Sequence, residues 1–111
     1  MTFNEYQEAS RKTAIYPSKN DIRGLLYVAL GLGGEAGEVC NKVKKILRDD
    51  LGVVAHLRRL EIMDELGDVL WYAAAVASEL NVTLEFIAEK NLTKLAKRAT
   101  EKKLHGSGDS R

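Results

Sequence analysis

Two acidic pentads of closely similar pattern lie thirty residues apart in the chain. The first reads Glu-Ala-Gly-Glu-Val over residues 35–39, and the second reads Glu-Leu-Gly-Asp-Val over residues 65–69. Each pentad places two carboxylates three residues apart, which are neighbours on one face of a helix. Hard oxygen ligands without histidine or cysteine select Mg²⁺ or Mn²⁺ over zinc. The chemistry that these residues suggest is therefore the binding of a hard divalent cation.

The two pentads are symmetric about one point in the chain. Glu35 and Asp68 are equidistant from the bond before Gly52, and Glu38 and Glu65 are equidistant from the same bond. The sequence Asp-Asp-Leu-Gly, which ends there, is typical of a turn. An antiparallel helical hairpin folded at this turn would place the four carboxylates level with each other. Because packed anions repel strongly unless a cation neutralises them, we predict that all four are metal ligands.

Solvated helix edges are the alternative explanation of these acidic residues. Four basic side chains would then balance their charge: Lys42, Lys44, Lys45 and Arg48. A single acidic pair would favour that explanation, but two pairs level across a hairpin favour the metal site. Gly37 and Gly67, one inside each pair, support it. A helix-interior glycine costs about 1 kcal/mol relative to alanine and suggests the close approach of a helix, ligand or backbone.

Neither pentad has a histidine at its fourth position, whereas di-iron helical proteins use Glu-x-x-His. Iron is therefore not expected. Mg²⁺ usually keeps coordination positions open for water and substrate phosphates, so the site predicts phosphate chemistry. Glu61, one turn before Glu65, is a candidate outer ligand, and Asp64 is expected on the surface.

The elements that would position these residues follow from helical periodicity, since no alternating β pattern occurs. The first expected helix spans residues 2–14, and the second spans residue 21 to residue 47 or 48, with Asn20 as its N-cap. The third begins between residues 54 and 59 and ends at residue 80. The fourth spans residues 84–104, with Thr83 as its N-cap. The expected fold is all-α, a four-helix bundle with a central antiparallel hairpin. Residues 1–104 would form one domain, followed by a flexible tail over 105–111.

An apolar stripe runs along each helix of the predicted hairpin, and the acidic residues lie at its edge. In the second hairpin helix it comprises Ile62, Leu66, Val69, Leu70, Ala73, Val76, Ala77 and Leu80. Trp71, Ala74 and Ala75 lie away from this stripe and form a second apolar face. A second apolar face in a small domain usually meets another subunit, so we expect a homodimer or homotetramer.

The fourth helix combines an amide with basic residues. Asn91 falls within its apolar stripe, and Lys94 and Arg98 lie on the neighbouring edge. One interpretation is a core asparagine with satisfied hydrogen bonds, since a buried amide without them is costly. The other is an amide that faces a pocket, with the two cations reaching phosphate oxygens.

Composition narrows the class of protein. The 45% hydrophobic and 30% charged residues are an ordinary globular balance, and a net charge of +1 gives no reason to expect stable nucleic-acid binding. No stretch approaches eighteen uninterrupted apolar residues, and the N-terminal residues lack the apolar run of a signal peptide. Cys40 is the single cysteine, which fits a reducing compartment. We expect a cytoplasmic protein without a membrane segment.

The chain resembles the MazG-like nucleotide pyrophosphohydrolases of the all-α NTP pyrophosphatase superfamily over about residues 16–103. That family is marked by Glu-x-x-Glu followed, after a spacer, by Glu-x-x-Asp. Here the motif reads Glu35-Ala-Gly-Glu38 and Glu65-Leu-Gly-Asp68, separated by the 26 residues 39–64. The flanking LGLGGEAGEV and DELGDVLWY, and the later KNLTKLAKR, are also similar to the family.

The resemblance implies cleavage of a nucleoside triphosphate, ribo or deoxyribo, between its α and β phosphorus atoms. The products would be the monophosphate and pyrophosphate, and the role would be house-cleaning of the nucleotide pool. It implies that Glu35, Glu38, Glu65 and Asp68 ligate Mg²⁺, for which Mn²⁺ would substitute. One glutamate, Glu35 in preference to Glu38, would accept the proton of the attacking water.

The resemblance also implies roles for residues outside the pentads. Asn91 would hydrogen-bond the nucleotide, and Lys94 and Arg98 would neutralise phosphate charge. Trp71 or Tyr72 would stack on the base, unless Trp71 serves a subunit interface instead. Family active sites often include residues from a neighbouring subunit. The alternatives are a phosphoribosyl-ATP pyrophosphohydrolase, which shares the acidic motif, and a non-catalytic helical module that binds Mg²⁺ and a partner.

Overall fold

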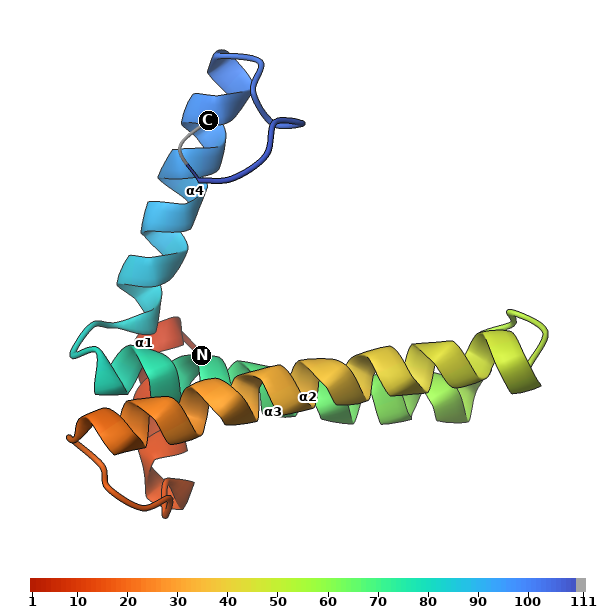
Figure 1. The fold of residues 1–111 in the computed structure, drawn as a ribbon, viewed down its shortest axis with the longest axis horizontal. Coiled ribbons are helices and arrows are strands. Elements are labelled where there is room, and N and C mark those ends of the chain that lie inside the picture. The colour runs from red at the N-terminus through yellow and green to blue at the C-terminus, as the bar shows by residue number, and fades with distance from the viewer. Residues whose placement is uncertain (110–111) are drawn as a thin grey trace.

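The computed structural model describes residues 1–109, and within them the protein is entirely helical (Figure 1). The elements are α1 (Phe3–Ser10), a 3-10 turn η1 (Arg11–Thr13), α2 (Ile22–Asp49), α3 (His56–Glu79) and α4 (Leu84–Thr100). No β-strand occurs in this part of the chain, so the predicted all-α class is confirmed. The last two residues of the predicted tail, 110–111, lie outside the described residues.

Helices α2 and α3 lie side by side and run in opposite directions, and the loop that joins them lies at the right-hand end of the hairpin in Figure 1. Helix α2 ends at Asp49, at the predicted turn. Leu51 and Gly52 then take positive φ angles of 53° and 78°, and the Gly52 N–H donates to the Ile46 carbonyl. Glycine adopts this left-handed backbone at little cost, which allows the chain to reverse.

The helix caps explain most of the boundaries, with one correction. Thr2 and Glu5 form a reciprocal capping box at the start of α1, and Thr83 caps α4 as predicted. The cap of α2 is Asp21, whose side chain accepts from the Arg23 N–H, and not Asn20. Asn20 has a φ of 66°, whereas an N-cap requires the extended backbone that the next residue has.

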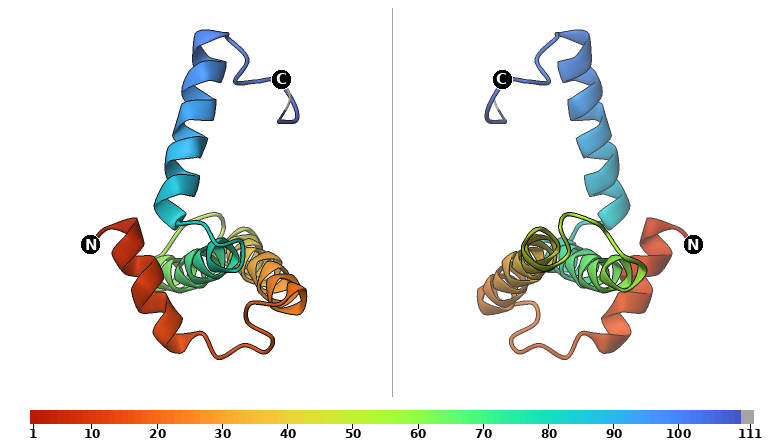
Figure 2. Two further views of the ribbon diagram at one scale, coloured as in Figure 1. Left: turned by 90° about the vertical axis from the view of Figure 1, so that its left-hand side faces the viewer. Right: turned by 90° about the vertical axis from the view of Figure 1, so that its right-hand side faces the viewer.

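The core lies at the end of the hairpin remote from its loop, where α1 crosses α3 (Figure 2). It is formed by Ala14, Tyr16, Val28 and Ala75, with Trp71, Tyr72 and Val76 packed against them. This corrects the assignment of Ala74 and Ala75 to a subunit interface. Both are buried within the chain, at 0% and 2% exposure, and Ala75 packs in the core with Ala14 and Tyr16 of the N-terminal segment.

Helix α4 projects away from the hairpin, so one chain does not form the closed four-helix bundle expected from the sequence (Figures 1 and 2). Its start is fixed by Gln7, which donates to Ser78 Oγ and the Val82 carbonyl and accepts from the Leu84 N–H. Beyond this point α4 presents apolar side chains to solvent, including Phe86 and Leu92 at 53% and 67% exposure. A helix with an uncovered apolar side is typical of a protein that packs against a partner.

Helix α4 ends at Thr100, four residues before the predicted end at 104. Lys102 has a φ of 56°, and the Lys103 N–H donates to the Arg98 carbonyl, which is a left-handed termination of the helix. The chain then folds back, and Asp109 reaches α4. Asp109, in the predicted tail, therefore contacts the helix.

Candidate metal centre

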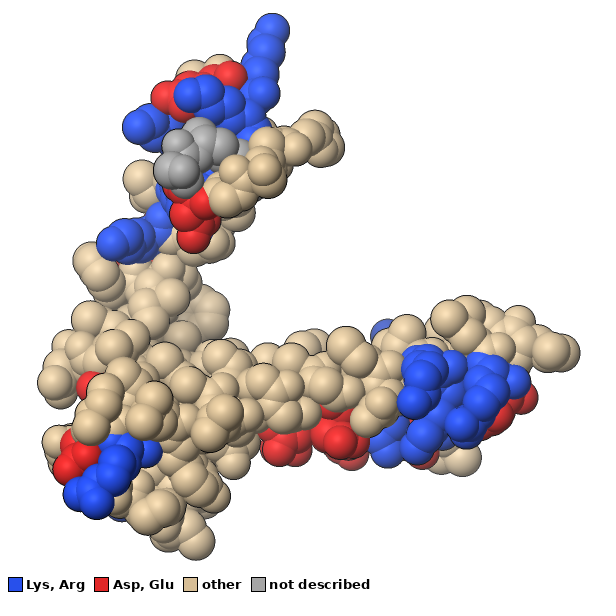
Figure 3. All heavy atoms as spheres, viewed as in Figure 1, with Lys and Arg blue, Asp and Glu red and all other residues tan. Residues whose placement is uncertain are grey.

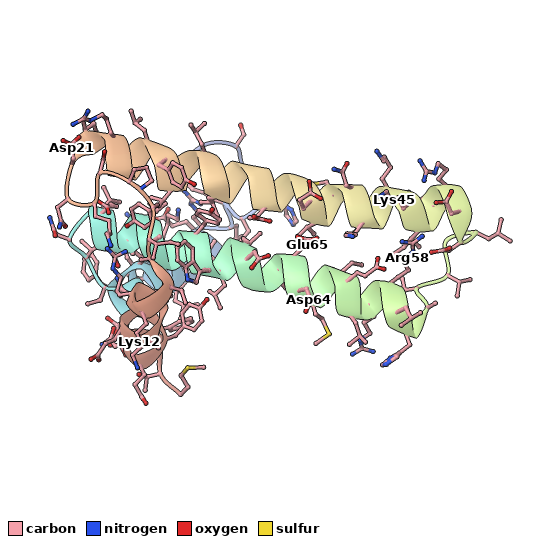
Figure 4. All side chains as sticks on the ribbon, turned by 90° about the horizontal axis from the view of Figure 1, so that it is seen from below. Lys12, Asp21, Lys45, Arg58, Asp64 and Glu65 are labelled. Carbon is pink, nitrogen blue, oxygen red and sulfur yellow. The ribbon has the colours of Figure 1, made fainter. Side chains whose placement is uncertain are left out.

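The middle of the hairpin brings together carboxylates from both pentads. One carboxylate oxygen from each of Glu35, Glu65 and Asp68 lies within 4.8 Å of the other two. Figure 4 shows Glu65 on the side of α3 that faces α2, and Asp64 on the opposite side. Figure 3 shows the acidic side chains of the hairpin gathered along its lower edge. Three carboxylates at these separations are suited to hold one or more hard divalent cations.

Glu38, the fourth predicted ligand, is exposed and is not part of this trio. Its charge nevertheless reaches Glu35. Partial burial raises the pKa of the Glu35 carboxyl, and the negative charges of Asp68, Glu65 and Glu38 raise that pKa further. Mutual repulsion within the group is thus a property of the folded hairpin, and a bound cation would relieve it.

A chain of ion pairs continues from this trio towards the hairpin loop. The Lys42 ammonium lies 3.9 Å from Glu65 Oε1 and 3.9 Å from Glu61 Oε2. Arg58 binds the same Glu61 oxygen at 3.2 Å and Asp50 at 2.9 Å. Figure 3 shows the corresponding change from acidic to basic side chains along the hairpin. Lys42 is one of the four basic residues that could balance the acidic charge, and its contact with Glu65 could not be predicted from the sequence.

An aromatic pocket of about 310 Å³ lies at the core end of the hairpin. It is lined by Thr13, Ile15, Tyr16, Pro17, Tyr27, Trp71 and Tyr72. Tyr72 adjoins the carboxylates: burial raises the pKa of its hydroxyl, and the charges of Tyr27, Glu35 and Asp68 add to this. Tyr16 and Tyr27 are not among the predicted site residues, because helical periodicity does not show that both lie beside Tyr72 in this pocket.

The indole of Trp71 is held within its own chain. Its Nε1 donates to Thr13 Oγ1 at 2.9 Å, and its ring meets Tyr72 edge-on with centroids 5.0 Å apart. These contacts fix the position of Trp71 at the wall of the aromatic pocket.

Gly31, one turn before Glu35, allows Tyr72 to lie across α2. A Cβ at Gly31 would overlap the Tyr72 ring. Gly37 and Gly67, by contrast, have nothing within 4 Å of a Cβ, so the close approach expected at these two glycines does not occur within the chain. The close approach to a glycine of α2 occurs instead at Gly31, where Tyr72 of α3 lies.

We predict that Gly31→Ala destabilises the protein by about 1–3 kcal/mol, because the added methyl displaces an aromatic ring in a packed region. Gly33→Ala is the matched control, since its Cβ would meet nothing within 4 Å. The control should gain up to about 1 kcal/mol from improved helix propensity. Urea unfolding monitored by circular dichroism measures both changes. Equal stability of the two variants would contradict the proposed contact.

The structure does not bring the predicted residues of α4 to the carboxylates. Asn91 is exposed, so it is not a buried core amide. Asn91 and Lys94 line a surface hollow of about 820 Å³ on α4. Arg98 is buried, and its Nη2 lies 3.0 Å from Asp109 Oδ1, which also pairs with Lys94 at 3.1 Å. Lys94 and Arg98 thus bind the carboxylate of Asp109, a residue of the same chain.

Comparison with known proteins identifies the family of the chain. The family model described as MazG nucleotide pyrophosphohydrolase domain matches residues 24–102. The Gene 37 protein of Mycobacterium phage L5 is 50% identical over 114 aligned residues, which cover all of both chains. No solved structure gave a significant match. None of the helices between residues 1 and 109 is long and apolar enough to cross a membrane. With the doubled acidic motif on one hairpin, the match shows that the chain belongs to the MazG nucleotide pyrophosphohydrolase domain family.

Proposed function

We propose that the protein is a Mg²⁺-dependent nucleoside triphosphate pyrophosphohydrolase that releases pyrophosphate and leaves the nucleoside monophosphate. The observation that carries this proposal is the convergence of Glu35, Glu65 and Asp68 from both halves of the motif. Membership of a nucleotide pyrophosphohydrolase family supports it. In this proposal Glu38, which follows Glu35 by one turn, completes the ligand set by a side-chain rotation.

Mg²⁺, or Mn²⁺ in its place, would neutralise triphosphate charge and lower the pKa of the attacking water. Glu35 then accepts the proton of that water. Its carboxylate belongs to the trio, so it would lie beside a water bound to the cation and within reach of the proton of that water. Glu65 and Asp68 hold the cation, and Tyr72 and the aromatic pocket beside them provide a stacking surface for the base.

The phosphate-binding residues of α4 would come from a second copy of the chain. Within one chain α4 leaves the hairpin on the side away from the acidic edge (Figure 3). An apolar hollow of about 540 Å³ on α3 is lined by Met63, Gly67 and four residues of the predicted core stripe, Leu66, Val69, Leu70 and Ala73. Leu66 is 57% exposed there. A homodimer or homotetramer would cover this surface and the apolar side of α4, and would bring Asn91, Lys94 and Arg98 to a neighbouring metal site.

Product analysis tests the proposed reaction. The purified protein is incubated with each of the eight common ribo- and deoxyribonucleoside triphosphates and with phosphoribosyl-ATP, with Mg²⁺ or with EDTA. We expect monophosphate and pyrophosphate in equal amounts from at least one triphosphate, and only with Mg²⁺. Cleavage of phosphoribosyl-ATP alone would establish the alternative enzyme. Absence of pyrophosphate from every substrate would favour a non-catalytic module.

We predict that Asp109 affects substrate affinity, because its carboxylate forms ion pairs with Lys94 and Arg98, the two residues proposed to bind phosphate. The hydrogen bond from Arg98, followed by that from Lys94, lowers the pKa of Asp109, so it is ionised at neutral pH and competes with phosphate. We expect Asp109→Asn to lower KM by about two- to fivefold, the range of an exposed ion pair. Glu101→Gln, which removes an acid from the same end of α4, is the control. An unchanged KM in Asp109→Asn would contradict the competition.

A further inference from the structure

Lys42 is placed where it interacts directly with the proposed metal ligands. Among residues 1–109, it is the one cationic side chain that forms an ion pair with a member of the trio. Its side chain is 25% exposed, and the Glu65 side chain is 20% exposed, so water screens their attraction less than on an open surface. Lys42 thus supplies positive charge at the edge of a group of anions.

The position of Lys42 is fixed by both helices of the hairpin. It lies on α2 one turn after Glu38, and it reaches across to Glu61 and Glu65, one turn apart on α3. Arg58 holds Glu61 at 3.2 Å from the other side. Neighbouring Lys44 is exposed and bonds to Asn41 on its own helix. The Lys42 contacts are therefore specific to its position on α2.

We propose that Lys42 is a positioning residue that supplies the counter-charge of the metal-free site and competes with the divalent cation for Glu65. This inference rests on the proposed metal site but adds a role that the acidic motif does not contain. Without metal, the ammonium group offsets the repulsion of the trio and keeps Glu65 directed towards α2. When a cation binds, the ammonium retains Glu61 as its partner.

Competition and simple structural support predict opposite changes in metal affinity. If Lys42 competes, removing its charge strengthens metal binding, because a like charge about 4 Å from a ligand oxygen no longer repels the ion. If Lys42 only supports the hairpin, removing it loosens Glu65 and weakens metal binding. The same substitution therefore separates the two roles by the sign of its effect.

The experiment measures Mn²⁺ binding to the metal-free protein by isothermal titration calorimetry, without nucleotide. We expect Lys42→Gln to bind Mn²⁺ about three- to tenfold more tightly than the wild type, from the loss of one partly screened charge. Lys42→Arg and the matched control Lys44→Gln should remain within about twofold of the wild type. The thermal unfolding midpoint should fall in Lys42→Gln with EDTA and recover with Mn²⁺. Lys42→Met, which keeps the apolar stem, repeats the test if the glutamine variant does not fold.

Equal or weaker Mn²⁺ binding by the folded Lys42 variants would overturn the inference and leave the proposed enzyme intact. A wild-type protein that binds no Mn²⁺ would overturn both, because the proposed enzyme depends on this metal site. The two failures are thus distinguished by the wild-type titration.

Discussion

Asp68→Asn lowers kcat/KM by at least about a hundredfold if the carboxylate trio binds the catalytic metal. Substitution of residues that only support metal ligands typically lowers metal affinity or activity by about 10–100-fold, so we expect the loss of a direct ligand to lower activity further. The substitution keeps the size of the side chain and removes its charge. Because Asp68 is exposed, the helix loses no buried contact, and the folded structure is retained. Pyrophosphate release under Mg²⁺ saturation and at rising Mg²⁺ concentrations measures the effect.

Asp64→Asn is the control for this prediction. Asp64 lies one turn before Asp68 on the same helix, but on the side of α3 that faces away from α2 (Figure 4). It carries the same charge and is also exposed to solvent, yet it is outside the trio. We expect wild-type activity from this variant. Equal losses in both variants would show that general surface charge, and not metal ligation, explains the effect of Asp68.

Arg98→Gln is expected to lower kcat/KM by about 10–100-fold, because a hydrogen bond between a guanidinium and a phosphate contributes about 1.5–3 kcal/mol. Lys97→Gln, an exposed neighbour on α4, should have little effect. Since Arg98 is buried, circular dichroism and the unfolding midpoint must first show that the variant folds. Full activity in the folded Arg98 variant would exclude its role in phosphate binding.

Mixing the two inactive variants tests whether α4 acts in a neighbouring subunit. In a dimer with shared sites, one site of each mixed dimer joins the intact carboxylates of the Arg98→Gln chain to the intact α4 of the Asp68→Asn chain. Random exchange of equal amounts should therefore restore about a quarter of wild-type activity. If each site uses residues of one chain only, the mixture stays inactive. Light scattering on the same samples gives the oligomeric state.

Local features of the structure could be predicted because their causes are local in sequence. Thr83 caps α4 through its own side chain, and the turn at Gly52 follows from a glycine in a left-handed conformation. The pairing of Glu35 with Asp68 follows from helical periodicity and the symmetric position of the turn. These predictions depend on residues that lie within a few turns of each other or at matched distances from one loop.

Features set by long-range packing could not be predicted in the same way. Ala74 and Ala75 have the pattern of an interface, but both are buried within the chain, and Ala75 packs with Ala14 and Tyr16, which are distant in the sequence. Asn91 follows the periodicity of a core position, but α4 projects away from the hairpin and leaves it exposed. Helical periodicity identifies which side chains share a face. It does not identify the element that packs against that face.

The position of the metal relative to the three carboxylates tests the central claim most directly. The measurement is anomalous diffraction from crystals grown with Mn²⁺ and a triphosphate whose α–β bridge cannot be hydrolysed. The account predicts an Mn²⁺ peak about 2.1–2.2 Å from oxygens of Glu35, Glu65 and Asp68, with the triphosphate bound to the same ion. Mn²⁺ and triphosphate bound elsewhere, with these three carboxylates in contact only with solvent, would contradict it.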